Sequence, residues 1–288
     1  MNMMDRKIRI KIFLRLLFLQ SGWNFERFQN IGFCFALMPY LKKTWPDCAR
    51  LKTALLRHFG IFNTQPYMAG FVVGNVCSIE EKISASKNSE EEEKFIKLAV
   101  DIKLALESSF AAIGDRIFWG RITPLATLLC LGVWSVAGFY GWFLTDAQLS
   151  VSAYILFAGP VLGVVIVTCV SSYIRWKGLE RGYACGGSNL CGLDMFPWPK
   201  IISKLSLTGL IFSISICIFT LITAGVYYYK NFGVEGLVFK AVLVMAAIGI
   251  FLIFRKLKKS MFLVLATLIV FSTIVVIISQ IEGIALIL

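Results

Sequence analysis

The sequence predicts an all-α integral membrane protein, because apolar residues dominate the chain and gather in long windows without charge. Hydrophobic residues make up 58% of the chain and charged residues 16%, and the mean hydropathy is +0.76. A soluble domain of this length needs a more polar surface. Residues 1–124 hold 18 of the 29 Lys and Arg residues. We therefore expect a transmembrane helical region in residues 125–288, preceded by a cytoplasmic and interfacial region.

Five apolar windows of the second half are candidates for transmembrane helices. About 20 apolar residues in a helix cross the roughly 30 Å hydrocarbon layer of a bilayer. The fourth window is short and interrupted by Lys240. It is either a crossing whose lysine reaches the interface or a re-entrant hairpin. The predicted spans are residues 125–144, 151–174, 205–229, 237–254 and 260–281.

The loops between these windows alternate in charge. Loops 145–150 and 230–236 carry few basic residues, whereas loops 175–204 and 255–259 are rich in Lys and Arg. Short loops rich in Lys and Arg stay in the cytoplasm. The pattern predicts a cytoplasmic N-terminal half, five crossings and an external C-terminus. Anionic lipid at the cytoplasmic face then accounts for the net charge of +12, and no nucleic-acid partner is needed.

The first 124 residues alternate polar runs with apolar segments that are too short to span a bilayer. Residues 8–19 carry Ile and Leu at helical spacing among basic residues, which predicts an interfacial amphipathic helix and no cleavable signal peptide. The apolar segments 31–41, 67–79 and 110–113 predict re-entrant or surface-lying helices. Two interpretations stay open: these segments line a cavity, or they are buried against a partner subunit.

The stretch 80–103 is strongly polar and contains the run Glu90–Glu93. We interpret it as a solvated cytoplasmic helix or loop. The alternative is a docking surface for a basic partner.

The sequence offers no set of residues typical of a catalytic or metal site. The eight cysteines lack metal-ligand spacing, and Cys185 and Cys191 fall in a predicted cytoplasmic loop, where thiols stay reduced. Neither a nucleophile–base pair nor a phosphate-binding loop stands out. We expect a non-catalytic chain with no cofactor and no metal.

Four short blocks follow one another over about two thirds of the chain. They read FLQSGWNFERFQNIGFCFALMP at 18–39, LRHF and FNTQPY within 56–67, IGDRIFWG at 113–120, and RWKGL with GY within 175–183. In this order they resemble the IID membrane components of the mannose-family (mannose/fructose/sorbose) sugar phosphotransferase system.

The chain departs from the family pattern at a few positions. Gln65 stands where the family commonly has His, and Arg116 and Arg121 stand where small or uncharged residues are usual. Ser108 and Ser109 replace a Gly-Pro pair. Beyond Lys200 the similarity is mainly one of hydropathy.

The resemblance implies a division of labour within a phosphoenolpyruvate-dependent permease of the bacterial cytoplasmic (inner) membrane. IIA and IIB carry the phosphoryl group on histidines, and IIC and IID form the translocating unit, as a higher oligomer of pairs. Phospho-IIB docks at the cytoplasmic face and phosphorylates a hexose or an amino sugar. The single histidine here, His58, is interpreted as a structural hydrogen-bonding residue. The alternative function is a non-transporting structural or receptor-like membrane protein derived from this family, motivated by the departures.

Within these blocks, polar and aromatic residues are candidates for contacts with substrate or with IIC. Asp115 either hydrogen-bonds sugar hydroxyls or caps a helix, with Arg116 or Arg121 as possible ion partners. The cluster around Pro66 either faces substrate or forms a turn in which Pro66 opens the next helix. The candidates are Trp23, Asn24, Glu26, Asn63, Thr64, Tyr67, Gly114, Asp115 and Trp119.

Two of these candidates, Trp23 and Glu26, follow the amphipathic helix. Trp23 suits an aromatic anchor at the membrane interface. Glu26 either pairs with Arg27 within the protein or contacts IIC.

Overall fold

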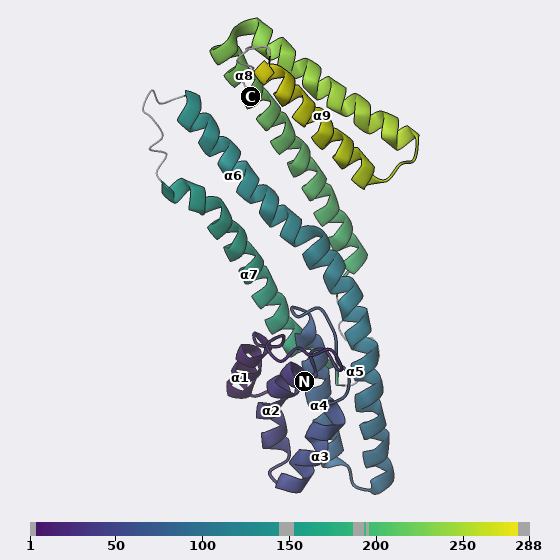
Figure 1. Ribbon diagram of the computed structural model, residues 1–288. Helices are drawn as coiled ribbons and strands as arrows, with labels where there is room; N and C mark the ends of the chain where they lie inside the picture. The colour runs from purple at the N-terminus through teal and green to yellow at the C-terminus, as the bar shows by residue number, and fades with distance from the viewer. Residues whose placement is uncertain (1–3, 144–152, 187–192, 194–195, 282–288) are drawn as a thin grey trace. The chain divides into compact units, whose positions relative to one another are not determined.

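A computed structural model describes residues 4–143, 153–186, 193 and 196–281, and in these residues regular structure is helical throughout (Figure 1). The elements are α1 (Arg6–Leu16), α2 (Asn30–Thr44), α3 (Cys48–His58), α4 (Ala69–Ala85), α5 (Ser89–Ile117), the π-helix η1 (Phe118–Ile122), α6 (Thr123–Phe143), α7 (Ala153–Cys185), α8 (Trp198–Lys256) and α9 (Met261–Ile281). The all-α prediction is confirmed for this part of the chain.

The chain divides into two compact units. The N-terminal unit comprises Met1–Trp134 and Ser152–Ile214, and the C-terminal unit comprises Ser135–Val151 and Ser215–Leu288. The helix α7 therefore belongs with the first third of the chain. The predicted separation of an interfacial region 1–124 from a transmembrane region 125–288 stays a prediction.

Three helical segments among the described residues have the length and apolar composition to cross a membrane. They are Ser89–Val136, Phe157–Cys185 and Trp198–Lys256, and a shorter apolar helix follows at Met261–Val275. The count of five crossings and their orientation stay predictions.

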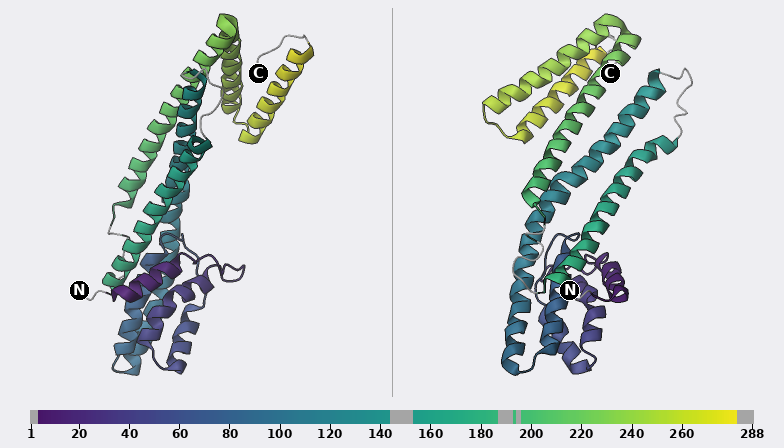
Figure 2. Two further views of the ribbon diagram at one scale, coloured as in Figure 1. Left: turned by 90° about the vertical axis from the view of Figure 1, so that its left-hand side faces the viewer. Right: turned by 180° about the vertical axis from the view of Figure 1, so that it is seen from behind.

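The predicted third and fourth spans lie in one long helix, α8, which is broken at Gly233. This residue has φ 65° and ψ −163°, a backbone conformation that glycine adopts without steric penalty. The break falls inside the predicted loop 230–236, and α8 changes direction there (Figure 2). Lys240 lies with its Nζ atom 5.0 Å from the centre of the Tyr228 ring, across the break. Both interpretations of the window around Lys240 stay open.

The core of the N-terminal unit is built on α4. Every residue from Ala69 to Glu80 is buried, and α4 packs against α2, α5 and α7. The segment 67–79 is thus a central helix of a packed unit, and within the chain itself it is covered by protein.

Helices α4 and α7 touch backbone to backbone. A Cβ atom added to Gly74 would lie 2.4 Å from the Leu179 carbonyl oxygen, and one added to Gly182 would lie 2.2 Å from the Phe71 carbonyl oxygen. Gly70 makes a similar approach to Arg175. Small residues four positions apart allow two helix backbones to come this close, so that dispersion contacts run along both helices.

The amphipathic helix α1 is present, but its apolar stripe faces protein. Ile12, Leu16 and Leu19 are enclosed, and α1 packs against α2 and α7. The guanidinium of Arg9 lies 4.5 Å from the centre of the Trp176 ring. The stripe attaches α1 to the unit, and the interfacial location of α1 stays a prediction.

Two expectations are corrected. Both ends of the polar stretch 80–103 are buried, because Glu80 and Lys103 enter the core, while the run Glu90–Glu93 at the start of α5 is mostly exposed. Cys185 is disulfide-bonded in the structure, so the expectation of a free thiol there is wrong. Cys191 lies outside the described residues.

The close α4–α7 contact makes glycine necessary at its centre. The substitution Gly74→Ala places a methyl group against the backbone of α7, so we expect a loss of about 2 kcal/mol or more in the free energy of unfolding. Denaturant or thermal unfolding in detergent measures it. The control is Gly249→Ala, whose added methyl group meets nothing within 4 Å among the described residues. A Gly74→Ala protein as stable as the wild type would contradict the packing described.

Candidate functional site

The first two sequence blocks are tied together by buried polar side chains. The Gln29 side chain donates to the Thr64 carbonyl at 2.9 Å and accepts from the Thr64 amide at 3.2 Å. The Thr64 hydroxyl donates to the Glu107 carbonyl on α5 at 2.9 Å. Because all polar atoms of Thr64 bond within the protein, its observed role is to hold the loop before α4 in place.

Asn24 has a similar role in the loop before α2. Its Nδ2 atom donates to Asn30 Oδ1 at 2.9 Å, and its Oδ1 atom accepts from the Arg27 amide at 2.8 Å. The backbone groups of Asn24 and Phe28 also bond to each other, at 2.9 and 3.0 Å. Asn24 therefore shapes a tight loop in which Phe28 has a positive φ of 55°.

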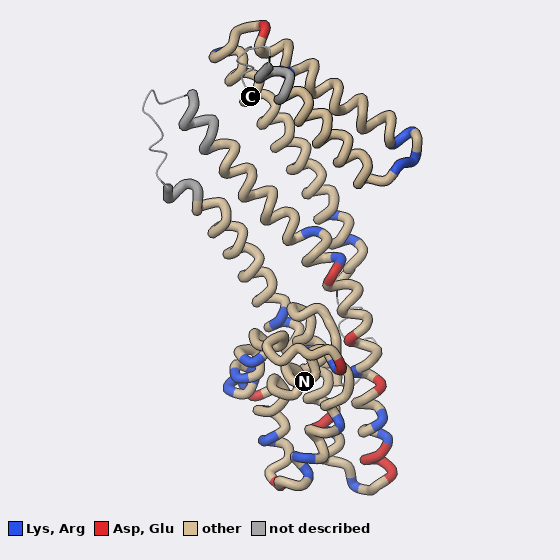
Figure 3. The backbone as a smooth tube through the Cα atoms, in the orientation of Figure 1, with Lys and Arg blue, Asp and Glu red and all other residues tan. Residues whose placement is uncertain are grey.

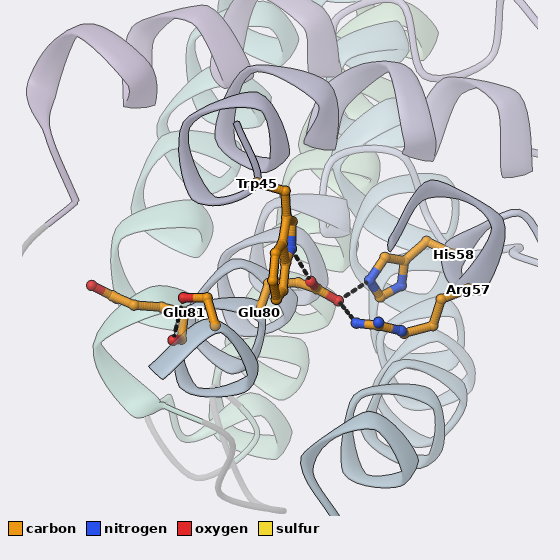
Figure 4. A network of polar contacts seen from close by, with 6 residues as sticks. Trp45, Arg57, His58, Glu80 and Glu81 are labelled. Carbon is orange, nitrogen blue, oxygen red and sulfur yellow. Dashed lines mark hydrogen bonds and ion pairs between the residues drawn. The ribbon is translucent and has the colours of Figure 1, made fainter. Parts of the chain in front are cut away.

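A buried carboxylate joins two helices, α3 and α4, and the α2–α3 connection. Glu80, on α4, is fully enclosed (Figure 4). Its Oε1 atom accepts from the Nη1 atom of Arg57 and lies 2.8 Å from the Nε2 atom of His58, both on α3. Its Oε2 atom accepts from the indole N–H of Trp45 at 2.8 Å. A buried charge persists when it is paired and hydrogen-bonded in this way.

The protonation states in this network follow from the contacts. Burial raises the pKa of Glu80, but the bonds from His58, Arg57 and Trp45 outweigh burial and hold that pKa below its usual value. Burial lowers the pKa of His58 despite its contact with Glu80. A neutral His58 therefore donates through Nε2 to an ionised Glu80. An enclosed ring engaged in this way supports the structural interpretation of His58.

The second, third and fourth blocks meet around Tyr67, at a place we call the motif junction (Gln65, Tyr67, Gly114, Phe118 and Arg175). The Tyr67 ring lies 4.5 Å from the Phe118 ring, and the Arg175 guanidinium lies 5.2 Å from the Tyr67 ring centre. Gly114 packs directly on Gln65, since an added Cβ atom would lie 2.4 Å from the Gln65 Cβ atom. The Gln65 side chain in turn accepts from the Tyr67 amide at 2.7 Å.

Two donors of the motif junction are buried without a hydrogen-bond partner in the described part of the chain. They are the Nε2 atom of Gln65 and the Nε atom of Arg175. Arg175 belongs to the fourth sequence block but is not among the site residues that the sequence predicts. The signal available was an arginine directly after a long apolar window, a position that requires a partner for its charge.

Five of the sequence candidates are wholly or partly directed outward: Trp23, Glu26, Asn63, Asp115 and Trp119. Trp119 is 61% exposed, and it lies four residues after Asp115 on the same helical run. Glu26 forms no ion pair with Arg27 among the described residues.

The helix-cap interpretation of Asp115 is wrong, because Asp115 lies near the end of α5, which continues through η1 into α6. Arg116 and Arg121 form no ion pair with it in the described chain. Arg121 instead donates to the Ser206 hydroxyl and to the Arg116 carbonyl, both at 2.9 Å. Pro66 lies in the turn before α4, which begins at Ala69, so it does not open that helix.

Sequence reasoning also missed a polar pocket of about 470 Å³ between α2, α4 and α7. The Glu81 carboxylate accepts there from the hydroxyl groups of Tyr183 and Tyr40. Burial raises the pKa of Tyr40 above its usual value, so its hydroxyl stays protonated. Tyr40 and Glu81 were invisible as a pair because 41 residues separate them in the sequence.

Comparison with known proteins decides the family. Residues 3–281 match the profile of the PTS system mannose/fructose/sorbose family IID component. The chain belongs to this family of IID components. The mannose-specific EIID component of Escherichia coli K12 is 31% identical over 176 residues, and the fructose permease IID component of Bacillus subtilis is 30% identical over 207 residues. These matches cover 61% and 72% of this chain, and 54% and 67% of the respective relatives.

Two solved structures are similar to this IID component. A cryoEM structure of the mannose transporter ManYZ in complex with microcin E492 aligns with a TM-score of 0.50 at 28% identity, covering 74% of this chain and 70% of that one. A structure described as a membrane protein aligns with a TM-score of 0.54 at 25% identity and the same coverages. The match to the Escherichia coli relative spans about half of that relative's length.

The buried carboxylate of this IID component carries a prediction about stability. The substitution Glu80→Gln leaves the Arg57 charge without a counter-ion, so we expect a loss of about 3–5 kcal/mol in the free energy of unfolding. Unfolding in detergent measures the loss. The control Glu93→Gln changes an exposed carboxylate of α5 and is expected to have little effect. A Glu80→Gln protein of wild-type stability would show that the network contributes little.

The same network predicts acid sensitivity. Because folding lowers the pKa of His58, the unfolded chain binds the proton more tightly, and stability falls as the pH drops below about 6.5. The low pKa of Glu80 adds a further loss at lower pH. His58 is the only histidine of the chain. His58→Gln, which keeps a donor toward Glu80, should flatten the melting temperature between pH 7 and pH 5. Equal slopes in both proteins would contradict this assignment.

Proposed function

We propose that this IID component pairs with a IIC subunit and forms with it the sugar-translocating unit of a phosphoenolpyruvate-dependent permease. A hexose or amino sugar passes through the pair and is phosphorylated by phospho-IIB at the cytoplasmic face. The observation that carries the proposal is the family match over residues 3–281. The likeness to the mannose transporter structure supports the pairing.

In this proposal the chain is a non-catalytic subunit. It supplies scaffold, gate and part of the docking surface for IIB, while IIC supplies most of the sugar contacts. The enclosure of His58, whose Nε2 atom bonds Glu80, supports this division, because a phosphoryl donor has no access to that nitrogen.

The outward face of α5 and η1 is the proposed contact with sugar or with IIC. It presents the exposed carboxylate of Asp115 and the exposed ring of Trp119 one helical turn apart. Carboxylates make strong directional hydrogen bonds, and an aromatic ring this exposed gains most when a partner covers it. The π-helix supports a functional interpretation, since insertions of this type occur often at functional sites.

The proposed location is the bacterial cytoplasmic membrane, with several crossings and a cytoplasmic N-terminal half. The distribution of charge supports it, because basic residues gather in the N-terminal unit and at a few helix ends (Figure 3). Anionic lipid is the expected partner of the exposed part of that charge. Assembly into a higher oligomer of IIC–IID pairs completes the proposal.

The alternative, a non-transporting protein of the same family, rests on the departures from the family pattern. Arg121, within η1, donates to the Ser206 hydroxyl and to the Arg116 carbonyl, so the added guanidinium has hydrogen-bond partners within the chain. The structure therefore offers no reason for loss of transport at Arg121.

Reconstitution tests the proposal. Vesicles containing IIC, with and without this chain, are supplied with phospho-IIB, and uptake of labelled sugar is measured. We expect uptake only when this chain is present. Equal uptake in the absence of this chain would contradict the proposal. An assembled IIC–IID pair without uptake would favour the non-transporting alternative.

Asp115 provides a sharper test within the assembled pair. If its carboxylate bonds sugar or gates its passage, Asp115→Asn lowers uptake by about tenfold or more, the size of a hydrogen bond to a charged group, while assembly is unchanged. The matched control is Asp101→Asn, another exposed carboxylate of α5. Normal uptake by Asp115→Asn would remove this residue from the site.

A further inference from the structure

Arg175 is a buried cation without a counter-ion in the part of the chain that the structure describes. It is 5% exposed, and the described residues offer it no hydrogen bond and no ion pair. Its guanidinium lies over the ring of Tyr67 at 5.2 Å, and its backbone is pressed against Gly70. Its Nε atom is enclosed without a partner.

The other enclosed or partly enclosed cations of the N-terminal unit are provided for differently. Arg57 bonds Glu80, and Arg9 and Lys177 both lie within 4 Å of Glu180. Lys103, at 2% exposure, also forms no ion pair among the described residues, but burial lowers its pKa, and an amine can lose its proton. Arg175 is therefore the buried, permanently charged group of the described unit that lacks a counter-ion. A guanidinium does not lose its proton in proteins, so burial leaves a full charge and five donors to be satisfied. One aromatic face compensates only part of that charge.

The surroundings of Arg175 favour an acceptor from outside the chain. The Gln65 Nε2 atom, at the same motif junction, is a second enclosed donor without a partner. No carboxylate of the described residues lies within ion-pair distance of Arg175, and its aromatic contact is the Tyr67 ring. Both donors lie within the sequence blocks that resemble the family, although Gln65 departs from its pattern.

We propose that an Asp or Glu side chain of the IIC subunit docks at the motif junction and completes Arg175 with an ion pair, which makes this arginine an assembly residue of IID. The inference rests on the proposed pairing with IIC. A carboxylate is planar and matches the guanidinium fork with two parallel hydrogen bonds. A sugar hydroxyl brings no charge, and a lipid phosphate is bulkier and finds exposed cations elsewhere on the unit.

The test compares the isolated chain with the IIC–IID pair. Arg175→Met keeps much of the side-chain length and removes the charge. We expect it to raise the melting temperature of the isolated chain, since an uncompensated buried charge disappears, and to weaken co-purification with IIC by tenfold or more. Arg175→Lys retains the charge without the fork and is expected to be intermediate. The control Lys97→Met removes an exposed cation of α5 and is expected to leave assembly unchanged.

The acidic partner is found by a double-mutant cycle. Each Asp and Glu of IIC is changed to its amide, and the correct one weakens assembly with wild-type IID but adds no further loss with Arg175→Met. A cycle that is additive at every position overturns the proposal.

Other outcomes assign Arg175 differently. Equal destabilisation of the isolated chain and of the pair by Arg175→Met makes the residue structural and overturns the proposal. Unchanged assembly with a raised KM for sugar makes it a substrate contact. Stabilisation of the isolated chain by phosphatidylglycerol vesicles and not by phosphatidylcholine vesicles, lost in Arg175→Met, makes it a lipid contact. Failure of wild-type IID to co-purify with IIC contradicts the proposed function itself, which separates the two failures.

Discussion

The close contact of α4 with α7 is the constraint on which the N-terminal unit depends. Gly74 and Gly182 lack the side chains that would hold the two backbones apart, and the contact joins two helices that lie far apart in the sequence. The contact also positions Tyr183 and Arg175 of α7. Tyr183 reaches Glu81, and Arg175 comes to lie over Tyr67, only because α7 is seated this deeply against α4.

The family blocks serve two different purposes. Asn24 and Thr64 form hydrogen bonds within the protein, and Gly114 allows Gln65 to pack directly on it because it has no side chain. These residues are required for folding. Asp115 and Trp119 belong to the same blocks, yet they project from a continuous helix and have no role in packing the unit. A shared sequence pattern in this family therefore combines the internal fold with the surface that a partner or substrate meets.

Two buried charges show where the unit supplies partners for its own charged groups and where it does not. Glu80 receives a cation, an indole N–H and an imidazole N–H, so its charge is stabilised without any outside group. Arg175 receives only an aromatic face from the residues that the structure describes. Burial costs free energy for either sign of charge, and the partners that the chain supplies decide how much of that cost is offset. The unit is closed around Glu80 and open at Arg175, which is the physical basis for regarding it as one part of a larger assembly.

Local pattern determined the helical class, the apolar windows and the family. An uncharged run such as 125–144 satisfies its backbone hydrogen bonds in a bilayer as a helix. The predicted loop 230–236 contains the glycine at which α8 breaks. Tertiary structure decided which faces those helices turn toward each other. The stripe of Ile12 and Leu16 is the same whether it meets lipid or protein, and the polarity of Glu80 indicates solvent until Arg57, His58 and Trp45 are brought around it. Periodicity is a property of neighbours along the chain, whereas the partners of a buried charge come from segments whose separation in sequence carries no signal.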